Sequence, residues 1–358
     1  MTNRQNDSHG NSLSDNAKET SHSKASGKRI FLVAISIIAA LAILVTSVFF
    51  IMSAIGKSRL HSDDNNISVP ADISVNVDDD GVIEYEGQKY KYNKNIASVL
   101  FLGIDKEDIG ENDGYGKNGQ ADSIFVACLD TSTGAVKIIP ISRETAVDVN
   151  LYSVSGEYAG IRNEQICLAY SYGKDAESSC KNVLTSVSRI LYGITPASYV
   201  AIDLNGVSTL TDMIGGVTLT SLETVGEFTE GKSVTLKGKN AVSYIRARGS
   251  DLEANNRRMQ RQKQFLGAFA SKAGNEILNN FTKLGTYYGK AKPYITTDLG
   301  LTEVVYLANC CLTTNVGNSI QYINIEGTST LVDGHVLFTP DSNSLYKAVL
   351  ETFYTPVK

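Results

Sequence analysis

Three charged residues, Asp105, Asp122 and Arg143, are predicted to meet at one edge of a β-sheet. Residues 123–130 and 135–142 have strand patterns joined by a four-residue link, which predicts an antiparallel hairpin. If the hairpin closes symmetrically, Asp122 lies opposite Arg143. Two neighbouring carboxylates repel each other unless a cation or a proton intervenes, so this group favours a divalent metal ion. The alternative is an ordinary cross-strand ion pair between Asp122 and Arg143, worth about 0.2–1 kcal/mol.

A second group of charged residues is a cluster of arginines. Five of the eleven arginines lie between residues 246 and 261, and this segment has no lysine although the chain has 22. A guanidinium group binds phosphate oxygens through a planar pair of hydrogen bonds, whereas lysine offers a point charge. A single arginine at a helix end is explained equally well by an extended side chain with its head in water. The clustering favours an anionic ligand such as a pyrophosphate, and the residues are Arg246, Arg248, Arg257, Arg258 and Arg261.

The second half of the arginine cluster is predicted to lie on one face of a helix. Spacings of three and four residues place Arg258, Arg261 and Gln262 on the same stripe as Phe265 and Phe269. The phenylalanines are expected to be buried, so the polar members of the stripe extend the buried face.

The elements that must position these residues indicate an α/β layer fold. The apolar run at residues 98–104 ends at Asp105 and is typical of a strand buried on both faces. Alternation around Glu86-Gly87 predicts a hairpin at residues 82–92. Further strand patterns cover residues 198–203, 217–222 and 319–325, and helical patterns cover residues 182–191, 205–214, 239–246 and 341–354.

An uncharged run at residues 30–52 predicts one transmembrane helix before this domain. Its 23 residues span roughly 34 Å at about 1.5 Å per residue, enough to cross a bilayer. A cleavable signal peptide is the alternative, although its apolar part is usually shorter. Basic residues are more frequent before the run than after it, which places the N-terminus in the cytoplasm.

This orientation divides the chain into four parts. Residues 1–29 are predicted to be a disordered cytoplasmic tail, residues 30–52 the membrane span, residues 53–80 an extracellular stalk, and residues 81–358 an extracellular domain. The protein is therefore expected in the cell membrane as a single-pass protein, and its chemistry must proceed without cytosolic ATP.

Composition excludes several other kinds of site. The net charge of −5 disfavours a nucleic-acid binder. Of the four histidines only His335 lies well within the predicted domain, so a zinc site or a Ser-His-Asp triad is disfavoured. A P-loop is excluded because Asn118 stands where Ser or Thr is required.

Cys167 and Cys180 either form a disulfide across the turn at Gly173 or remain two reduced core thiols, and both alternatives stay open.

Six segments resemble the LytR-CpsA-Psr family in their order and spacing, over roughly residues 96–272. They are SVLFLGID, QADSIFVACLD, IIPISRET, SYVAID with the following GGV, LKGKNAVSYIRAR and RMQRQKQFL. A single membrane anchor before the domain is also this family's layout. The resemblance implies a mixed central β-sheet flanked by helices, with a hydrophobic tunnel for a lipid chain.

The resemblance also implies an activity. Members transfer anionic glycopolymers, such as teichoic acid or capsule, from a polyprenyl-pyrophosphate carrier to peptidoglycan outside the membrane of mainly Gram-positive bacteria. The implied class is a Mg²⁺-dependent phosphotransferase of cell-wall biogenesis, with Mn²⁺ as the alternative metal. Its partners would be the carrier-linked glycopolymer, peptidoglycan and membrane lipid, with no nucleic acid. A polyprenyl-pyrophosphate hydrolase and a non-catalytic anchored binding or regulatory protein remain alternatives.

The family's motifs assign roles to individual residues by resemblance. Asp105 and Asp122 match the acids that hold the metal, and together with Arg143 and Arg246 they form the implied catalytic set. The implied pyrophosphate-binding residues are Arg143, Arg246, Arg248, Arg258, Arg261 and Gln262.

The chain departs from the family's pattern at three places. Gln120 stands where an arginine is usual, Ser142 and Glu144 flank Arg143 in place of Pro and Asp, and Asn255 replaces a common acid. These changes bear on the rate and the substrate more than on the class of reaction.

Overall fold

The computed structural model describes residues 52–61, 68, 73, 75–78, 81–110, 114–247, 254–280, 283–314 and 320–357. Residues 52–358 belong to one compact unit. The predicted cytoplasmic tail and the predicted membrane span, apart from Met52, lie outside the described residues. Within the described ranges, no helix is both long enough and apolar enough to span a bilayer.

A six-stranded mixed sheet forms the centre of the unit. It consists of β4 (Ile96–Ile104), β5 (Ala121–Asp130), β6 (Val136–Ile141), β9 (Ser198–Ile202), β12 (Ile295–Thr297) and β13 (Ile320–Tyr322), in the order β12-β9-β4-β5-β6-β13. β4 runs parallel to β9 and antiparallel to β5, and β6 runs parallel to β13. The predicted α/β class and the mixed central sheet are confirmed.

The predicted hairpin of β5 and β6 forms with the predicted register. The Asp130 amide donates to the Ala135 carbonyl at 2.9 Å, and Ile124 lies opposite Ile141. On the other side of β5, Ala121 pairs with Ile104 and Ser123 with Gly103, which leaves Asp122 as the extra residue of a β-bulge. Bulges redirect side chains at the ends of strands, and this one lies at the start of β5.

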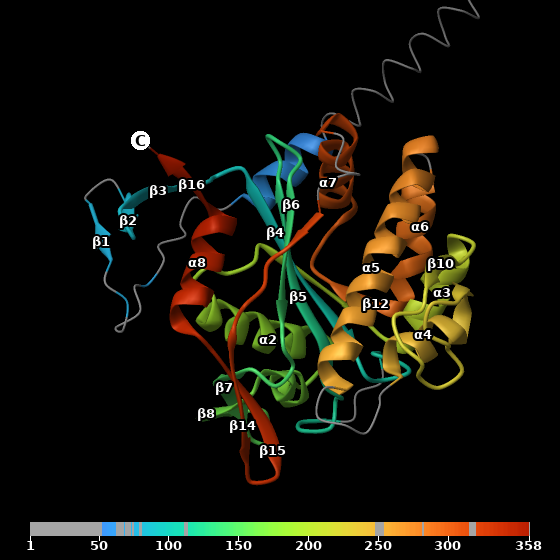
Figure 1. The fold of residues 1–358 in the computed structure, drawn as a ribbon, viewed down its shortest axis with the longest axis horizontal. Coiled ribbons are helices and arrows are strands. Elements are labelled where there is room, and N and C mark those ends of the chain that lie inside the picture. The colour runs from blue at the N-terminus through green and yellow to red at the C-terminus, as the bar shows by residue number, and fades with distance from the viewer. Residues whose placement is uncertain are drawn as a thin grey trace, which may run out of the picture. The chain divides into compact units, whose positions relative to one another are not determined.

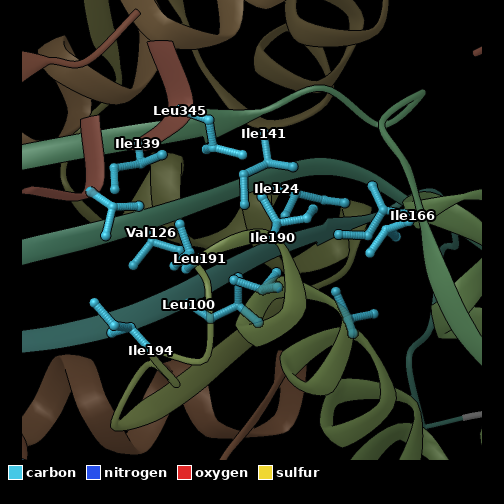
Figure 2. Packing of buried hydrophobic residues seen from close by; sticks show 14 of the residues in the cluster. Leu100, Ile124, Val126, Ile139, Ile141, Ile166, Ile190, Leu191, Ile194 and Leu345 are labelled. Atoms are coloured by element: carbon cyan, nitrogen blue, oxygen red, sulfur yellow. The ribbon is translucent and has the colours of Figure 1, made fainter. Parts of the chain in front are cut away.

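One face of the central sheet packs against α2 (Ala176–Ile190) and α8 (Ser342–Phe353). Alternate residues of the strands point into this layer because successive side chains of a strand point to opposite faces. Figure 2 shows the layer, which contains Leu100, Ile124, Val126 and Ile139 from the strands and Leu345 of α8. All of these side chains are buried, so this layer is the main hydrophobic core.

The opposite face packs against α7 (Leu301–Thr314) and against a helix at residues 52–60. In Figure 1, α2 and α8 lie on the other side of the sheet from α5 (Ala254–Asn279) and α6 (Lys283–Ala291). Leu60 is buried with Tyr306 of α7, and Arg59 pairs with Glu303 at 3.2 Å. The first described part of the predicted stalk therefore packs on the domain, because an apolar face of this helix covers the sheet.

A smaller cluster of apolar residues lies beside this second face and carries part of the arginine cluster. Phe265 is buried in it, as the predicted helical stripe requires, and so is Tyr244. The Phe265 and Phe269 rings lie 6.1 Å apart. Besides α5 and α6, its elements are α3 (Leu204–Met213), β10 (Val217–Thr220), β11 (Ser233–Leu236) and α4 (Gly238–Arg246), and η2 (Lys292–Tyr294) follows α6.

Two hairpins and a small sheet complete the described residues. The predicted hairpin at Glu86-Gly87 forms, and both residues have positive φ angles, as a tight two-residue turn requires. It joins β2 (Ile83–Tyr85) to β3 (Gln88–Tyr92) in a sheet with β1 (Asn76–Val77) and β16 (Tyr354–Val357). The other hairpins are β7 (Ala146–Tyr152) with β8 (Tyr158–Gln165), followed by η1 (Ile166–Tyr172), and β14 (Gly327–Val332) with β15 (His335–Pro340).

Cys167 on η1 and Cys180 on α2 are both free and fully buried thiols. Of the two alternatives for this pair, the structure therefore has the reduced one. Burial raises the pKa of the Cys180 thiol, which keeps it neutral within the core.

The N-terminus of α2 supports a prediction about stability. The Asp175 carboxylate accepts from the Ser178 amide at 2.8 Å, while the Ser178 hydroxyl accepts from the Asp175 amide at 3.1 Å. The first of these bonds holds the pKa of Asp175 below its usual value, so its stabilisation is present above the unfolded-state pKa and is lost as the pH falls through the folded-state pKa. We expect Asp175→Ala to lower the free energy of unfolding in urea by about 0.5–2 kcal/mol at neutral pH.

The matched control is Asp175→Asn, which keeps an oxygen acceptor for the cap but cannot titrate. We expect Asp175→Asn to remain close to the wild-type stability, and its difference from Asp175→Ala to be independent of pH. A loss in Asp175→Ala that stays constant well below the usual Asp pKa would contradict this role for the ionised carboxylate.

Candidate active site

Asp122 and Arg143 form an ion pair at the edge of the sheet where β5 begins and β6 ends. Arg143 Nη1 contacts Asp122 Oδ1, and Arg143 Nη2 donates to Gln120 Oε1. Asp105 follows β4 directly, and its amide donates to the Gln120 carbonyl at 3.1 Å. The structure therefore brings Asp105, Asp122 and Arg143 to one edge, as the hairpin register predicts.

Two arginines of the cluster reach these aspartates from the neighbouring helices. Arg246, the last residue of α4, places Nη2 2.9 Å from Asp105 Oδ1, and its side chain is 54 % exposed. Arg258 of α5 places Nη1 3.5 Å from Asp122 Oδ2, and its side chain is 8 % exposed. Asp122 thus lies between two guanidinium groups. The more exposed contact, between Arg246 and Asp105, is the one that an incoming anion can reach.

Arg261 and Gln262 lie elsewhere in the cluster. Arg261 is fully buried, with Nε donating to the Tyr244 carbonyl at 3.1 Å and Nη2 donating to the Ala247 carbonyl. Gln262 Nε2 donates to the Ile245 carbonyl at 3.4 Å. In this structure the two side chains hold the C-terminal end of α4. Arg248 lies outside the described residues.

Glu223 is a member of the cluster for which the sequence shows no signal. It lies in the turn-rich segment between β10 and β11, and its carboxylate contacts Arg257 Nε at 2.7 Å and Arg261 Nη1. Because this segment has no periodic pattern, its place beside α5 depends on tertiary packing that the sequence does not reveal.

The electrostatic balance of the described cluster is positive. Five guanidinium groups form ion pairs with three carboxylates, and the carboxylate of Glu144 lies near Arg143 as well. Burial acts to lower the pKa of Arg143, but the neighbouring Cys167 and Asp122 outweigh it and raise that pKa. Burial in turn raises the pKa of Cys167, while Arg143, whose Nη2 donates to the Cys167 Sγ at 3.4 Å, acts to lower it.

A partly buried apolar strip leads along the second face of the sheet to these charges. The Phe101 and Phe125 rings stack at 5.0 Å, and Gly103 and Ala127 lie on the same face. At the far end of β5 the hydroxyl of Thr131 lies 3.4 Å from His61 Nε2, which follows the helix at residues 52–60. β5 extends about 27 Å from this end to Asp122, at roughly 3.4 Å per residue.

A sequence profile decides the family. The profile of the LytR_cpsA_psr family matches residues 56–352. The chain belongs to the LytR_cpsA_psr family.

Two curated relatives in this family are polyisoprenyl-teichoic acid–peptidoglycan teichoic acid transferases by name. TagU of Oceanobacillus iheyensis is 25 % identical over 253 residues, covering 69 % of this chain and 72 % of that protein. TagV of Bacillus subtilis is 26 % identical over 266 residues, covering 71 % of this chain and 63 % of that protein.

Solved structures show the same fold as this LytR_cpsA_psr protein. The crystal structure of B. subtilis TagV superposes with a TM-score of 0.56 and 23 % identity, covering 72 % of this chain and 95 % of that one. The protein gbs0355 from Streptococcus agalactiae superposes with a TM-score of 0.59 and 17 % identity, covering 74 % and 90 %. These likenesses support the central mixed sheet with flanking helices.

One departure from the LytR_cpsA_psr pattern has a visible consequence. Gln120, where an arginine is usual, offers its side-chain oxygen to Arg143. An arginine at this position could not accept this hydrogen bond, because a guanidinium group has donors only. The chain therefore has one fewer cation at the edge of the sheet and holds Arg143 by an additional acceptor.

The oxygen donors at this edge fit a hard divalent cation. Mg²⁺ is usually bound by one or two carboxylates together with substrate phosphates, and Asp105 and Asp122 are two such carboxylates. Over the described part of the chain, no group of three or more His, Cys, Asp and Glu side chains gathers into a metal site. A metal at this edge would therefore need phosphate oxygens or water to complete its coordination.

Proposed function

We propose that this protein is a membrane-anchored extracellular phosphotransferase that moves an anionic glycopolymer from a polyprenyl-pyrophosphate carrier to peptidoglycan. The observation that carries the proposal is the positive cluster around Asp105 and Asp122 at the end of a partly buried apolar strip. A carrier of this kind has an apolar chain and an anionic pyrophosphate, so each part has a matching surface. The names of the curated relatives support the same activity.

The arginines would bind the pyrophosphate and stabilise its departure. A disubstituted pyrophosphate carries two negative charges, which the excess of guanidinium groups in this cluster would help to neutralise. Arg246 would contact the phosphate oxygens first because it is half exposed. Fixed cations of this type stabilise the charge that develops on a leaving phosphate.

The reaction itself is a transfer of a phosphoryl-linked polymer. A sugar hydroxyl of peptidoglycan attacks the phosphorus that carries the glycopolymer, and a new P–O bond forms. The P–O bond to the bridging oxygen breaks, and polyprenyl phosphate leaves with that oxygen. Asp105 or Asp122 would accept the proton of the hydroxyl.

Asp105 and Asp122 would also hold the cofactor, which we propose to be Mg²⁺ or Mn²⁺. When bound, such an ion neutralises charge on the pyrophosphate. The arginines that pair with the two aspartates would then contact the phosphate oxygens in their place.

We propose the topology that the sequence predicts for the rest of the chain. Residues 1–29 would lie in the cytoplasm, residues 30–52 would cross the membrane once, and the domain would lie outside with the carrier lipid at its apolar strip. Nucleic acid is not among the proposed partners.

The experiment that tests the proposal measures what happens to the lipid carrier and to its saccharide. The full chain in detergent receives a polyprenyl-pyrophosphate saccharide and Mg²⁺, with and without peptidoglycan oligomers, while released polyprenyl phosphate and peptidoglycan-linked saccharide are measured. Metal-dependent release coupled to saccharide on peptidoglycan supports the transferase. Release to water alone would identify a hydrolase, and tight binding without release would identify an anchored binding protein.

A further inference from the structure

The C-terminal end of α4 is held by side chains of α5. The carbonyl groups in the last turn of a helix have no partner within that helix. Here the Tyr244 and Ala247 carbonyls accept from Arg261, and the Ile245 carbonyl accepts from Gln262 at 3.4 Å. A guanidinium group at this end also interacts favourably with the negative end of the helix dipole. The two α5 side chains therefore act as a cap for α4.

The buried position of Arg261 separates it from the other arginines of the cluster. Its side chain is 1 % exposed, whereas that of Arg246 is 54 % exposed. Three contacts already engage its guanidinium group: the Tyr244 carbonyl, the Ala247 carbonyl and Glu223. Because the side chain is 1 % exposed, an anion could reach Arg261 only by displacing the residues packed around it, so the geometry favours a structural role within the site.

Glu223 supplies the countercharge that such a buried cation requires. A buried cation without a partner is strongly destabilising. Glu223 contacts Arg261 Nη1 with one carboxylate oxygen and Arg257 Nε with the other, at 2.7 Å. These two arginines lie four residues apart on α5, so Glu223 links one face of this helix to the segment between β10 and β11.

The helix end that Arg261 and Gln262 cap carries Arg246. It is the last residue of α4, and its guanidinium reaches Asp105 at 2.9 Å. A shift of the last turn of α4 would move Arg246 relative to Asp105, because their contact depends on the position of this one helix end.

We propose that Arg261 is a positioning residue that caps α4 and thereby aims Arg246 at Asp105, that Glu223 is a positioning residue that holds Arg261 in place, and that Arg261 is not a ligand of the pyrophosphate. The catalytic consequence of this inference rests on the proposed function. The capping itself does not, and it can be measured separately.

The decisive variant is Glu223→Gln, because the two roles of Arg261 predict opposite signs. If Arg261 is a positioning residue, the variant loosens the cap, and both the affinity for inorganic pyrophosphate and the transfer rate fall, the rate by about 10²-fold. If Arg261 and Arg257 are ligands restrained by Glu223, the variant frees them and removes a negative charge, and pyrophosphate binds more tightly. Tighter or unchanged binding would overturn the proposal. The charge-matched control is Glu230→Gln, whose side chain is exposed in the same segment.

A double-mutant cycle tests whether Arg261 acts through Arg246. Arg261→Lys keeps the charge but cannot make the same set of contacts, so we expect it to lower transfer in the wild-type background. In an Arg246→Ala background the same change should have little further effect, since there is no side chain left to aim. Equal losses in both backgrounds would show an independent role for Arg261 and would overturn the proposal.

Hydrogen–deuterium exchange of the full chain separates this inference from the proposed function. We expect Glu223→Gln and Arg261→Lys to raise amide exchange in the last turn of α4, at residues 243–247, and Glu230→Gln to leave it unchanged. If the wild type neither binds pyrophosphate nor transfers saccharide, the proposed function fails while this measurement still decides the capping. Unchanged exchange in both cluster variants would overturn the capping whatever the activity.

Discussion

Asp122→Asn is expected to lower transfer by about 10²–10⁴-fold while the chain still folds. Asp122 lies between Arg143 and Arg258, and its carboxylate is the one that both guanidinium groups contact. The amide has nearly the same shape and can still accept from one arginine, so the packing of the edge is retained. It can neither accept the proton of the attacking hydroxyl nor ligate a metal as a carboxylate does. The measurement is the rate of polyprenyl phosphate release with peptidoglycan present.

The control for this variant is Asp148→Asn on β7. Asp148 is exposed, its side chain accepts from Asn163 at 3.0 Å, and its carbonyl accepts from Arg189, which is not part of the arginine cluster. We expect it to transfer at the wild-type rate. An Asp122→Asn protein with the wild-type thermal transition and an unchanged rate would remove Asp122 from the chemistry and leave it as the centre of an ion-pair network.

Arg246→Ala is expected to give the second large loss, of about 10²–10³-fold in transfer, with little change in stability. Its side chain is 54 % exposed and pairs with Asp105, which is itself 38 % exposed, and pairs of this kind contribute little to folding. The loss would instead arise from the missing charge at the pyrophosphate, so the affinity for inorganic pyrophosphate should fall as well. Isothermal titration and thermal unfolding of the same preparation separate the two effects.

The matched control is Arg162→Ala on β8. The Arg162 side chain is 63 % exposed and also pairs with a carboxylate, Glu164, at 3.6 Å. We expect this variant to bind pyrophosphate and to transfer as the wild type does. If both alanine variants behaved alike, the exposed arginines would matter only through the overall charge of the domain.

The charged residues at the edge of the sheet could be predicted because turn length and strand pairing determine their positions. A four-residue link between two strand patterns of equal length predicts the register of β5 and β6, and that register alone places Asp122 beside Arg143. The nearly continuous apolar run before Asp105 likewise identifies β4 as a buried strand. The stripe on α5 follows from helical spacing, and its phenylalanines are packed as that spacing requires.

The environment of the arginines could not be predicted in the same way. Helical spacing shows that Arg258 and Arg261 share a face, but not that the first meets Asp122 while the second meets carbonyl groups of α4. Glu223 lies in a segment without periodicity, so nothing in the sequence connects it to α5. The partner of each arginine depends on how α5 packs against the edge of the sheet and against α4.

The hairpin of β14 and β15 is not among the predicted elements, although the sequence contains a turn signal for it. Asp333-Gly334 between two short runs is a common two-residue turn, and both residues have positive φ angles in the structure. The helix at residues 52–60 is harder to assign from the sequence, because its apolar side faces a sheet that only the fold provides.

The separation of the site residues along the chain has a consequence for how the protein folds. Asp122 and Arg143 are 21 residues apart within one hairpin, whereas Asp122 and Arg258 are 136 residues apart. Closing the longer loop costs about 2 kcal/mol more in chain entropy, so the hairpin pair is expected to form early and the contacts with α5 late. Asp122 would then meet Arg143 first and Arg258 only near the end of folding. Intermediates would carry exposed negative charge at this edge, and only the completed domain would attract a polyanion.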